Sequence, residues 1–349
     1  MKKGKRTLTI GQSTKEQYAE KVKSNLMKAQ VNNSGISDVA GLQQATTTLT
    51  QLISGVVETK FYELSGQKLS DFTAIEVGKG AYATDLLQYA VNYVGQEGQG
   101  WINPSANGIA KDANHTIQIG SMRIKNHFWR GDYSISNELV QMGRVNDQTF
   151  SIIEEHEKAR KKSYDLEIQK KHFFGFDGEA DSTGLLNQAN VAVNTTLMTA
   201  TLAKMTDAQF QTFLASVGAE YGRNSQYAIQ FNRMLIPTSD FLSLGQPFGQ
   251  FGLSRLAVLE DALKRVAGAD FKIVHAKYCD MANEAGNGAR YVFYNADADN
   301  LCAFMPKPYT PHPLFPQGSL DLISQAEAQY IPPYLKRTNS MLYADVQVG

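Results

Sequence analysis

The side chains best suited to bind a metal or to act as a nucleophile stand alone in this chain of 349 residues. His156-Glu157 begins the pattern of a helical zinc-protease site, in which a second histidine follows four residues after the first. That position holds Arg160, which cannot serve as the second ligand. Cys279 and Cys302 form no Cys-x-x-Cys pair and are too few for a disulfide framework. We therefore predict no zinc site, and we expect both cysteines in strand cores.

A calcium-loop pattern also begins without being completed. Asn295, Asp297 and Asp299 occupy the first three ligand positions of such a loop. Asn300 stands where the turn requires glycine, and Pro306 stands where the loop requires a bidentate glutamate. The chain also lacks a phosphate-binding lysine loop, a dinucleotide glycine fingerprint and a Gly-x-Ser-x-Gly turn. The residues thus predict a structural protein that needs no cofactor, rather than an enzyme.

The charge of the chain is balanced, with 34 basic and 34 acidic residues. A dedicated nucleic-acid-binding domain is usually strongly basic, so the balance argues against that class. Residues 1–30 are an exception, because eight bases against Glu16 and Glu20 leave a net charge of +6 there. No run of about 18 apolar residues occurs, so we expect no membrane span. The low cysteine content and the absence of a secretory signal fit a reducing cytoplasm.

A long, charged helix is predicted over residues 148–171, which contain no glycine or proline. We expect it to end at Phe173-Phe174, where Gly175 and Gly178 favour a turn. Its thin apolar face is expected to comprise Thr149, Ile152, Ile153, His156, Ala159, Ser163 and Leu166. Acid–base pairs at four-residue spacing are expected to stabilise the opposite face by about 0.2–0.5 kcal/mol each: Glu154 with Lys158, Glu157 with Lys161, and Glu167 with Lys171.

The turn after this helix reads Asp181-Ser-Thr-Gly-Leu-Leu-Asn187. The charged helix, its aromatic end and the Gly184-Leu185-Leu186-Asn187 turn together resemble the spine helix and following turn of tailed-phage major capsid proteins. Tyr133-Ser-Ile-Ser-Asn-Glu-Leu139 also resembles the segment that precedes the spine helix in that family. The family has the Hong Kong 97-type fold, which encapsulin shells share. The resemblance covers about residues 130–349 in the order of its motifs.

An extended hairpin is predicted upstream of this helix. The apolar stretch Leu86–Val94 is followed by a loop rich in glycine at its start, and then by alternating strands at His115–Ile119 and Met122–Trp129. An isolated two-stranded hairpin is only marginally stable, so a long one needs a partner surface. In the capsid fold this hairpin would be the extended loop that lies across a neighbouring subunit.

The second half of the chain predicts an α/β lobe. Thr206-Asp-Ala-Gln209 has the spacing of a capping box, so a helix is expected to begin there. A strand over 227–236, a helix over 254–267 and strands over 271–275 and 290–294 follow. From Met305 onward the density of prolines predicts extended, edge-like backbone.

The resemblance implies an α+β fold in five parts. They are an N-terminal arm (1–60), an extended loop with its flanking strands (61–130), a peripheral domain with the spine helix (131–224), an axial α/β domain (225–305) and return strands of the peripheral domain (306–349). It further implies a virion protein that assembles in the cytoplasm of a bacterial host, through hexamers and pentamers, into an icosahedral head around double-stranded DNA. Expected partners are other copies of the chain, a portal, and scaffold or decoration proteins, with no membrane.

Two groups of residues are expected to make contacts in such a shell. The candidates for assembly contacts are Trp101, Lys111, Glu154, Lys158, Lys161, Phe173, Phe174, Gly184, Leu185, Leu186 and Asn187. The candidates for non-specific contact with packaged DNA are Lys2, Lys3, Lys5 and Arg6. Some capsids of this fold crosslink a loop lysine to an asparagine of a neighbour. No asparagine can be matched to Lys111 from the sequence, so we expect non-covalent assembly.

Two other functions stay open at this point. An encapsulin-like compartment shell has the same fold, but such shells generally lack a long basic arm and load protein cargo instead of DNA. A soluble two-domain enzyme would need an active site, and no complete catalytic motif is present. Both shell functions predict closed particles, whereas the enzyme predicts a stable monomer or small oligomer with a deep polar pocket.

Overall fold

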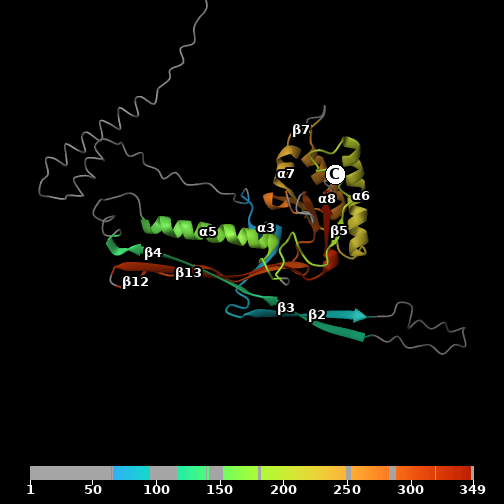
Figure 1. The fold of residues 1–349 in the computed structure, drawn as a ribbon. Coiled ribbons are helices and arrows are strands. Elements are labelled where there is room, and N and C mark those ends of the chain that lie inside the picture. The colour runs from blue at the N-terminus through green and yellow to red at the C-terminus, as the bar shows by residue number, and fades with distance from the viewer. Residues whose placement is uncertain are drawn as a thin grey trace, which may run out of the picture. The chain divides into compact units, whose positions relative to one another are not determined.

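The computed structural model describes residues 64, 66–94, 116–138, 140, 152–179, 182–248, 253–280, 282, 288–318 and 320–346. The chain divides into two compact units, Met1–Phe61 and Tyr62–Gly349, and every described residue belongs to the second. The predicted arm therefore lies outside the described residues. Within the described part, two five-stranded sheets and two two-stranded ribbons carry the fold (Figure 1).

The first sheet is built around one long strand, β13 (Asp321–Leu335). On one side β13 pairs with β11 (Leu301–Pro311) and with the short β12 (Phe315–Gln317), and on the other side it pairs with β4 (His127–Ser136). These pairings are antiparallel, whereas β1 (Ala74–Val77) adds to β11 in parallel. A short helix, α3 (Leu69–Phe72), precedes β1.

The prolines of this sheet lie where a strand has lost one of its neighbours. The pairing of β4 with β13 ends at Tyr330, and Pro332 and Pro333 follow. The pairing of β1 with β11 ends at Met305, and Pro306 follows directly. Proline has no N–H to donate to a ladder, so it is tolerated where no neighbour needs that donor. The expectation of edge-like backbone is wrong for most of β13, which lies between two neighbours.

The long helix α5 (Ile152–Phe174) lies along β4 and β13 and ends where the sequence predicts (Figure 1). Its buried face is not the predicted one. Four buried side chains recur at four-residue steps, namely Arg160, Tyr164, Ile168 and His172, and Gln169 and Phe173 are buried beside them. Members of the predicted apolar face are exposed instead, namely His156, Ala159 and Ser163. The prediction was wrong because Arg160, Gln169 and His172 are polar, so apolar periodicity does not mark the buried face.

Arg160 can be buried because polar groups of the sheet surround its guanidinium. Its Nη1 donates to the carbonyl oxygens of Ser324 at 2.8 Å and Gly131 at 3.4 Å. Its Nε donates to the Tyr309 hydroxyl at 3.1 Å, and its Nη2 donates to the Glu157 carboxylate. The guanidinium therefore contacts β4, β11 and β13 together, which fixes the position of α5 along the sheet.

The ion pairs of α5 also differ from the predicted ones. The lysines expected to pair with an acid four residues earlier have other partners: Lys158 with Glu155 at 2.8 Å, Lys161 with Asp165 at 3.6 Å, and Lys171 with Asp177 at 3.2 Å. Glu167 accepts a hydrogen bond from Trp129 Nε1 of β4 at 2.8 Å. Several charges are equally well spaced on this helix, so its tertiary surroundings decide which of them meet.

The second sheet forms the core of the α/β lobe. Its strand order is β5 (Ala192–Asn194), β14 (Met341–Asp345), β10 (Arg290–Tyr294), β6 (Arg233–Pro237) and β9 (Lys272–Ala276). The helices that pack on one face are α6 (Asp207–Ser225), α7 (Thr238–Leu244) and α8 (Arg255–Ala267). Between α7 and α8 lies a small ribbon of β7 (Pro247–Phe248) and β8 (Leu253–Ser254). The opposite face packs against Phe173 at the end of α5.

The sequence signals for these helices are confirmed. Thr206 and Gln209 form the predicted capping box at the start of α6. Ser254 caps α8 by accepting a hydrogen bond from Ala257 N, and α8 ends at the predicted Gly268. These boundaries depend on residues within one helical turn, so local sequence is enough to predict them.

Two segments of the lobe lie elsewhere than predicted. The last strand, β14, was expected among the return strands of the other sheet, but it pairs with β10 and β5. Helix α6 packs into the core of the second sheet although it precedes residue 225. The lobe therefore begins before the predicted boundary and includes the last described strand. The division into named subdomains stays a prediction.

The predicted hairpin is present as β2 (Asp85–Val94) and β3 (Thr116–Lys125), which are antiparallel along their whole length. The strands predicted at His115–Ile119 and Met122–Trp129 are divided differently in the structure, because β3 is continuous to Lys125 and β4 begins at His127. The base of the hairpin packs on the first sheet through Leu86 and Ile124, next to Phe304 and Ile331. These sheet residues alternate with those that face α5, so the hairpin and α5 use opposite faces of the sheet.

We predict that Arg160→Ala lowers the free energy of unfolding by about 2–4 kcal/mol, because it leaves buried carbonyl and hydroxyl groups without a donor. Chemical denaturation of the purified chain checks this value. Lys158→Ala is the matched control on the same helix, and its exposed side chain predicts a change within about 0.5 kcal/mol. Equal losses for the two variants would contradict the role given to Arg160.

Candidate assembly site at the end of helix α5 and on the extended hairpin

The carbonyl end of α5 is fully hydrogen-bonded. An α-helix leaves its last four carbonyl oxygens without a partner inside the helix. Gly175 N and the turn after it supply the missing donors: Gly175 N to Lys171 O at 2.8 Å, Leu185 N to His172 O at 3.0 Å, Leu186 N to Phe173 O at 2.9 Å, and Asn187 Nδ2 to Phe174 O at 2.8 Å. The Gly184–Asn187 turn is therefore the cap of the long helix.

Two glycines permit this close approach. A Cβ on Gly184 would lie 2.3 Å from the carbonyl carbon of Phe173 and 2.4 Å from its oxygen. A Cβ on Gly175 would lie 1.9 Å from the Ser182 oxygen, and Gly175 also has a φ of +74°. Asn187 closes the turn, because its Oδ1 accepts a hydrogen bond from Gly184 N at 2.6 Å. Glycine is thus required at both positions for steric reasons.

A buried ion pair ties the turn to the second sheet. Arg290 on β10 and Asp345 on β14 are register partners, and the guanidinium donates to both carboxylate oxygens at 2.7 Å. The remaining nitrogen, Nη1, donates to the Leu186 carbonyl at 2.6 Å. Tyr343 stacks on the guanidinium and donates from its hydroxyl to the Leu185 carbonyl at 2.9 Å. Bidentate geometry and a third acceptor offset the loss of water around the two charges.

His172 lies fully buried beside this turn. Its Nδ1 is 2.6 Å from the Tyr330 hydroxyl of β13, and its Nε2 is 3.3 Å from the Thr73 hydroxyl. Burial disfavours the charged imidazolium and lowers the pKa of His172 to about 3. The ring is therefore neutral at pH 7, and it joins α5 to β13 and to the segment before β1.

Three of the predicted assembly residues have no surface to offer to a neighbour. Phe173 and Leu185 are 0% exposed and Leu186 is 1% exposed within a single chain. They belong to the core between the turn and the second sheet. Gly184 is buried as well, and Phe174 is half-buried. The prediction that residues of this core contact a neighbouring subunit is therefore corrected. These residues form a buried core that positions the turn.

Other predicted residues keep an exposed position or lie outside the described part. Asn187 is exposed, although its amide caps the helix. Glu154, Lys158 and Lys161 lie exposed on α5, where they stay candidates for contacts with a neighbour. The remaining candidates lie outside the described residues, namely Trp101, Lys111, Lys2, Lys3, Lys5 and Arg6.

Three residues of this junction carry no sequence signal for their role. Arg290 and Asp345 are 55 positions apart, and no short motif links an arginine to an aspartate over such a distance. His172 follows two lysines in the last turn of a charged helix, where a solvent-exposed side chain is the ordinary expectation. A sequence signal for the ion pair would have required a pattern that identified β10 and β14 as neighbouring strands.

The hairpin exposes apolar side chains on one face. Leu87 is 51% exposed and Tyr89 is 66% exposed, and they share a face because strand residues alternate. Their register partners on β3 are Arg123 and Ser121, which are also exposed. Large apolar side chains are rarely left this open on a two-stranded ribbon without a partner.

The root of the hairpin is held by side-chain amides. Asn126 Nδ2 donates to the Ala83 carbonyl at 2.8 Å and to Gln329 Oε1 at 3.1 Å. The same Gln329 oxygen accepts a hydrogen bond from Tyr82 N at 2.9 Å. Both strands of the hairpin are thereby anchored to β13, so the direction in which the hairpin leaves the sheet is defined.

Chemistry other than packing has little support in the described part of the chain. There, no three histidine, cysteine, aspartate or glutamate side chains come together as a metal site. Asp297, from the calcium-loop pattern, accepts a hydrogen bond from Asn232 Nδ2 at 3.1 Å. Cys302 lies in strand β11 as predicted, whereas Cys279 lies in a short 3-10 helix (Lys277–Cys279). None of the described helices has the length and apolar character that a membrane crossing requires.

Comparison with known proteins finds capsids. A family model described as major capsid protein matches residues 105–346. The structure is similar to the capsid of Myoviridae phage XM1, with a TM-score of 0.68 and 13% identity over 90% of this chain and 100% of that chain. It is also similar to the capsid of the native GTA particle, with a TM-score of 0.56 and 14% identity over 90% and 99% of the two chains. A solved structure from Microbacterium phage Oxtober96 matches with a TM-score of 0.56 and 10% identity over 87% and 98%. Curated protein sequences show no match.

We predict that Gly184→Ala destabilises the chain by about 3 kcal/mol, because the added methyl group overlaps helix backbone that cannot move aside. Thermal and denaturant unfolding of the purified chain measure the loss. Gly245→Ala is the control, since the nearest atom to its added Cβ lies at 3.6 Å and its φ is −70°. A Gly184→Ala variant as stable as the control would show that the turn does not depend on this contact.

His172 is predicted to make stability depend on pH. Its pKa is about 3 when folded and near 6.5 when unfolded, so between these values the unfolded chain binds more protons. The contribution is therefore complete above pH 6.5 and is lost as the pH falls, by up to about 1.4 kcal/mol per pH unit. Unfolding measured between pH 7.5 and 4.5 should show a flatter pH dependence for His172→Gln than for the unchanged chain. The exposed His156→Gln should keep the original slope, and equal slopes for all three would refute the assignment.

Proposed function

Because the chain belongs to the major capsid protein family, we propose that it builds the shell of a tailed-phage head, through hexamers and pentamers, around double-stranded DNA. The family match spans residues 105–346 of 349, which is well over half of the chain. Membership makes the chain a structural protein of the virion that assembles with copies of itself, and not an enzyme. The predictions of a major capsid protein with a mixed α+β fold of the Hong Kong 97 type are thereby confirmed.

The finer architecture is part of the proposal. We assign the first sheet and α5 to the peripheral domain, with α5 as the spine helix. We assign the second sheet with α6, α7 and α8 to the axial domain. Strand pairing supports this division, since β14 and β5 join the second sheet and β11 and β13 join the first. The boundary predicted at residue 225 is moved accordingly.

The observation that carries the assembly proposal is the exposed apolar face of the hairpin. Leu87 and Tyr89 are solvated in a single chain, while Asn126 and Gln329 hold the hairpin root to the sheet. A ribbon of two strands cannot build a core of its own, so burial of this face must come from another surface. In a shell, a neighbouring copy supplies that surface. The exposed charges of α5 add weak ion pairs with neighbouring copies.

The remaining partners follow from the same function. A closed head that takes up DNA needs a portal, and its assembly can involve scaffold or decoration proteins. Lys2, Lys3, Lys5 and Arg6 give the start of the chain a positive charge suited to the phosphate backbone. Contacts of this kind are non-specific in sequence and weaken with salt.

We predict that the double variant Leu87→Asp/Tyr89→Asp stays folded but no longer forms closed particles, because two charges would have to be buried against the neighbour. Negative-stain electron microscopy and light scattering measure assembly, and circular dichroism measures folding. Gln88→Asp places a charge on the opposite face of the same strand and is expected to assemble normally. Normal particles from the double variant would refute the proposed docking face.

The nucleic acid content of the particles tests the DNA part of the proposal. Particles from infected cells are expected to contain double-stranded DNA that nuclease cannot reach. Closed particles that hold only protein cargo would instead indicate a compartment shell of the encapsulin kind.

A further inference from the structure

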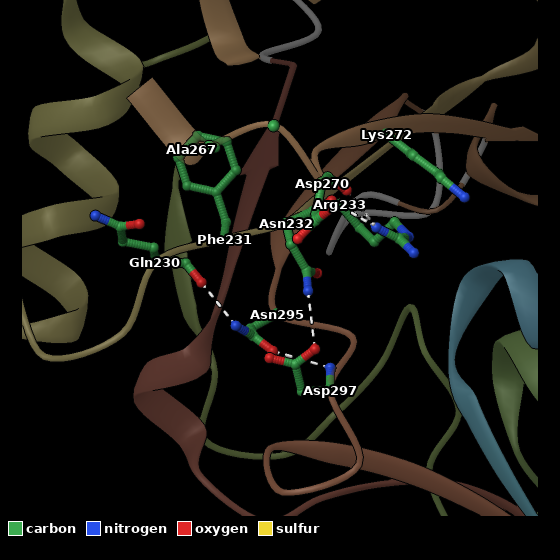
Figure 2. A pocket seen from close by; sticks show the side chains of 11 residues that line it. Gln230, Phe231, Asn232, Arg233, Ala267, Asp270, Lys272, Asn295 and Asp297 are labelled. Carbon is green, nitrogen blue, oxygen red and sulfur yellow. Dashed lines mark hydrogen bonds between the residues drawn. The ribbon is translucent and has the colours of Figure 1, made fainter. Parts of the chain in front are cut away.

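A hollow of about 570 Å³ opens at one end of the α/β lobe, and its lining is mostly polar (Figure 2). Three segments form it: residues 230–233 at the start of β6, residues 267–272 between α8 and β9, and residues 295–297 after β10. Its volume lies within the range of about 300–1,000 Å³ that is usual for sites that bind small molecules. These segments take no part in the cap of α5 or in the root of the hairpin, so the hollow is separate from both.

Hydrogen bonds between the three segments fix the walls of the hollow. Asn295 Nδ2 donates to the Gln230 carbonyl at 2.8 Å, which joins the segment after β10 to the start of β6 (Figure 2). Arg233 Nη1 donates to the Asp270 carbonyl at 3.0 Å, which joins the start of β6 to the segment after α8. The chain therefore shapes the hollow by itself, as is typical of a preformed binding site.

The charges that line the hollow are balanced. They comprise two cations and two carboxylates, namely Arg233, Lys272, Asp270 and Asp297. The Asp270 carboxylate and the Lys272 ammonium have no partner in the described part of the chain, so both are available to a ligand. The carboxylates repel an anion and the basic groups repel a cation, whereas a neutral hydroxyl group can donate to a carboxylate and accept from an ammonium. The lining thus favours a neutral ligand with several hydroxyl groups.

An aromatic side chain lies exposed next to the hollow. Tyr227 is 76% exposed, more than any other large apolar side chain in the described part. Its ring packs on Gly222 of α6, where an added Cβ would be 2.6 Å away. Val266 packs on Gly218 in the same way, one helical turn or about 5–6 Å from Gly222, and the residue after Val266, Ala267, lines the hollow. Tyr227 therefore presents an exposed aromatic ring at the edge of the hollow.

The backbone holds this tyrosine in a conformation that L-amino acids rarely adopt. Gln226 has a φ of 52° and Tyr227 a φ of 60°, so two successive residues other than glycine are left-handed. Glycine would make the same capping bonds to α6 without strain, so the cap does not require a tyrosine. Residues held in such a conformation cluster at functional sites, including those that bind ligands. The strain, the exposure and the adjoining hollow together indicate that the ring contacts a ligand.

We propose that the hollow and Tyr227 together bind a neutral oligosaccharide. The tyrosine ring packs against the apolar C–H face of one sugar ring, and the hydroxyl groups of the next sugar enter the hollow. There the Asp270 carboxylate accepts hydrogen bonds from hydroxyl groups, while Lys272 and the side-chain amide of Gln230 donate to them. This binding goes beyond the shell function and does not depend on assembly, so the isolated subunit is expected to bind as well.

Titration of the purified full chain with maltose, cellobiose and lactose, followed by saturation-transfer NMR, tests the site. We expect saturable binding of at least one of these neutral disaccharides. Tyr227→Gly removes the ring and relieves the backbone strain, and Asp270→Ala removes a carboxylate that has no partner in the described structure. Each change is expected to weaken binding by about tenfold or more without lowering the unfolding temperature.

Gln226→Gly and Asp261→Ala are the matched controls. The first relieves strain at the neighbouring residue and keeps the ring, and the second removes an exposed carboxylate of α8 that does not line the hollow. Both are expected to bind the sugar as the unchanged chain does. Equal binding by the unchanged chain and all four variants would place the ligand elsewhere and overturn the proposal. Absence of saturable binding would overturn it too, as would tighter binding of glucose 6-phosphate or glucosamine, since the site is then not one for a neutral sugar.

A free sugar and a polysaccharide share this chemistry, and assembled particles distinguish the two. Particles that are retained on an immobilised polysaccharide built from the sugar that binds, and are released by the disaccharide, would support a polysaccharide ligand. Particles that bind the disaccharide but are not retained would support a free sugar. Retention that Tyr227→Gly leaves unchanged would contradict the proposed site.

Discussion

The hydrogen bonds that the Gly184–Asn187 turn donates to the carbonyl end of α5 are the contacts on which the other parts of the described structure depend. The same turn offers its own carbonyls to the second sheet, where Arg290 binds Leu186 and Tyr343 binds Leu185. The amide and carbonyl groups of Leu185 and Leu186 thus each have a partner in another element, which buried polar groups require. Because α5 lies on the first sheet, this one turn joins both sheets to the long helix.

Directional polar contacts, more than apolar area, set how the described elements meet. Arg160 bonds three strands from one position on α5, and His172 bonds β13 and the segment before β1. Apolar packing alone tolerates small slides of a helix over a sheet, whereas these bonds are satisfied in only one register. Buried polar groups are expensive to leave unpaired, so they favour a single arrangement of helix and sheet. A shell built from many copies of one subunit needs such a defined shape.

Exposed apolar side chains occur on several separate elements of the described structure. Leu87 and Tyr89 lie on the hairpin, whereas Tyr227 and Val266 lie on the α/β lobe. A subunit in a closed shell meets several neighbours through different surfaces, so more than one uncovered region is consistent with that role. By contrast, the core around Phe173 is buried within one chain, so it has no surface that could contact a partner.

Features encoded by neighbouring residues could be predicted from the sequence. The end of α5 at Phe174, the capping box of Thr206 and Gln209, and the pairing of the hairpin strands each depend on residues close in the chain or on a strong alternation. The Gly184–Asn187 turn carried the family resemblance, because steric overlap with Phe173 leaves glycine no alternative at its first position.

The sequence by itself therefore determined the order of the elements, the family and the absence of a complete catalytic motif. Only the tertiary structure decided which face of α5 is buried, because Arg160 and His172 are polar and their partners lie on distant strands. It also decided that β14 joins β10, and that Arg290 meets Asp345 across 55 positions. Contacts of this kind depend on how sheets and helices pack together. A pattern within one stretch of the chain therefore cannot predict them.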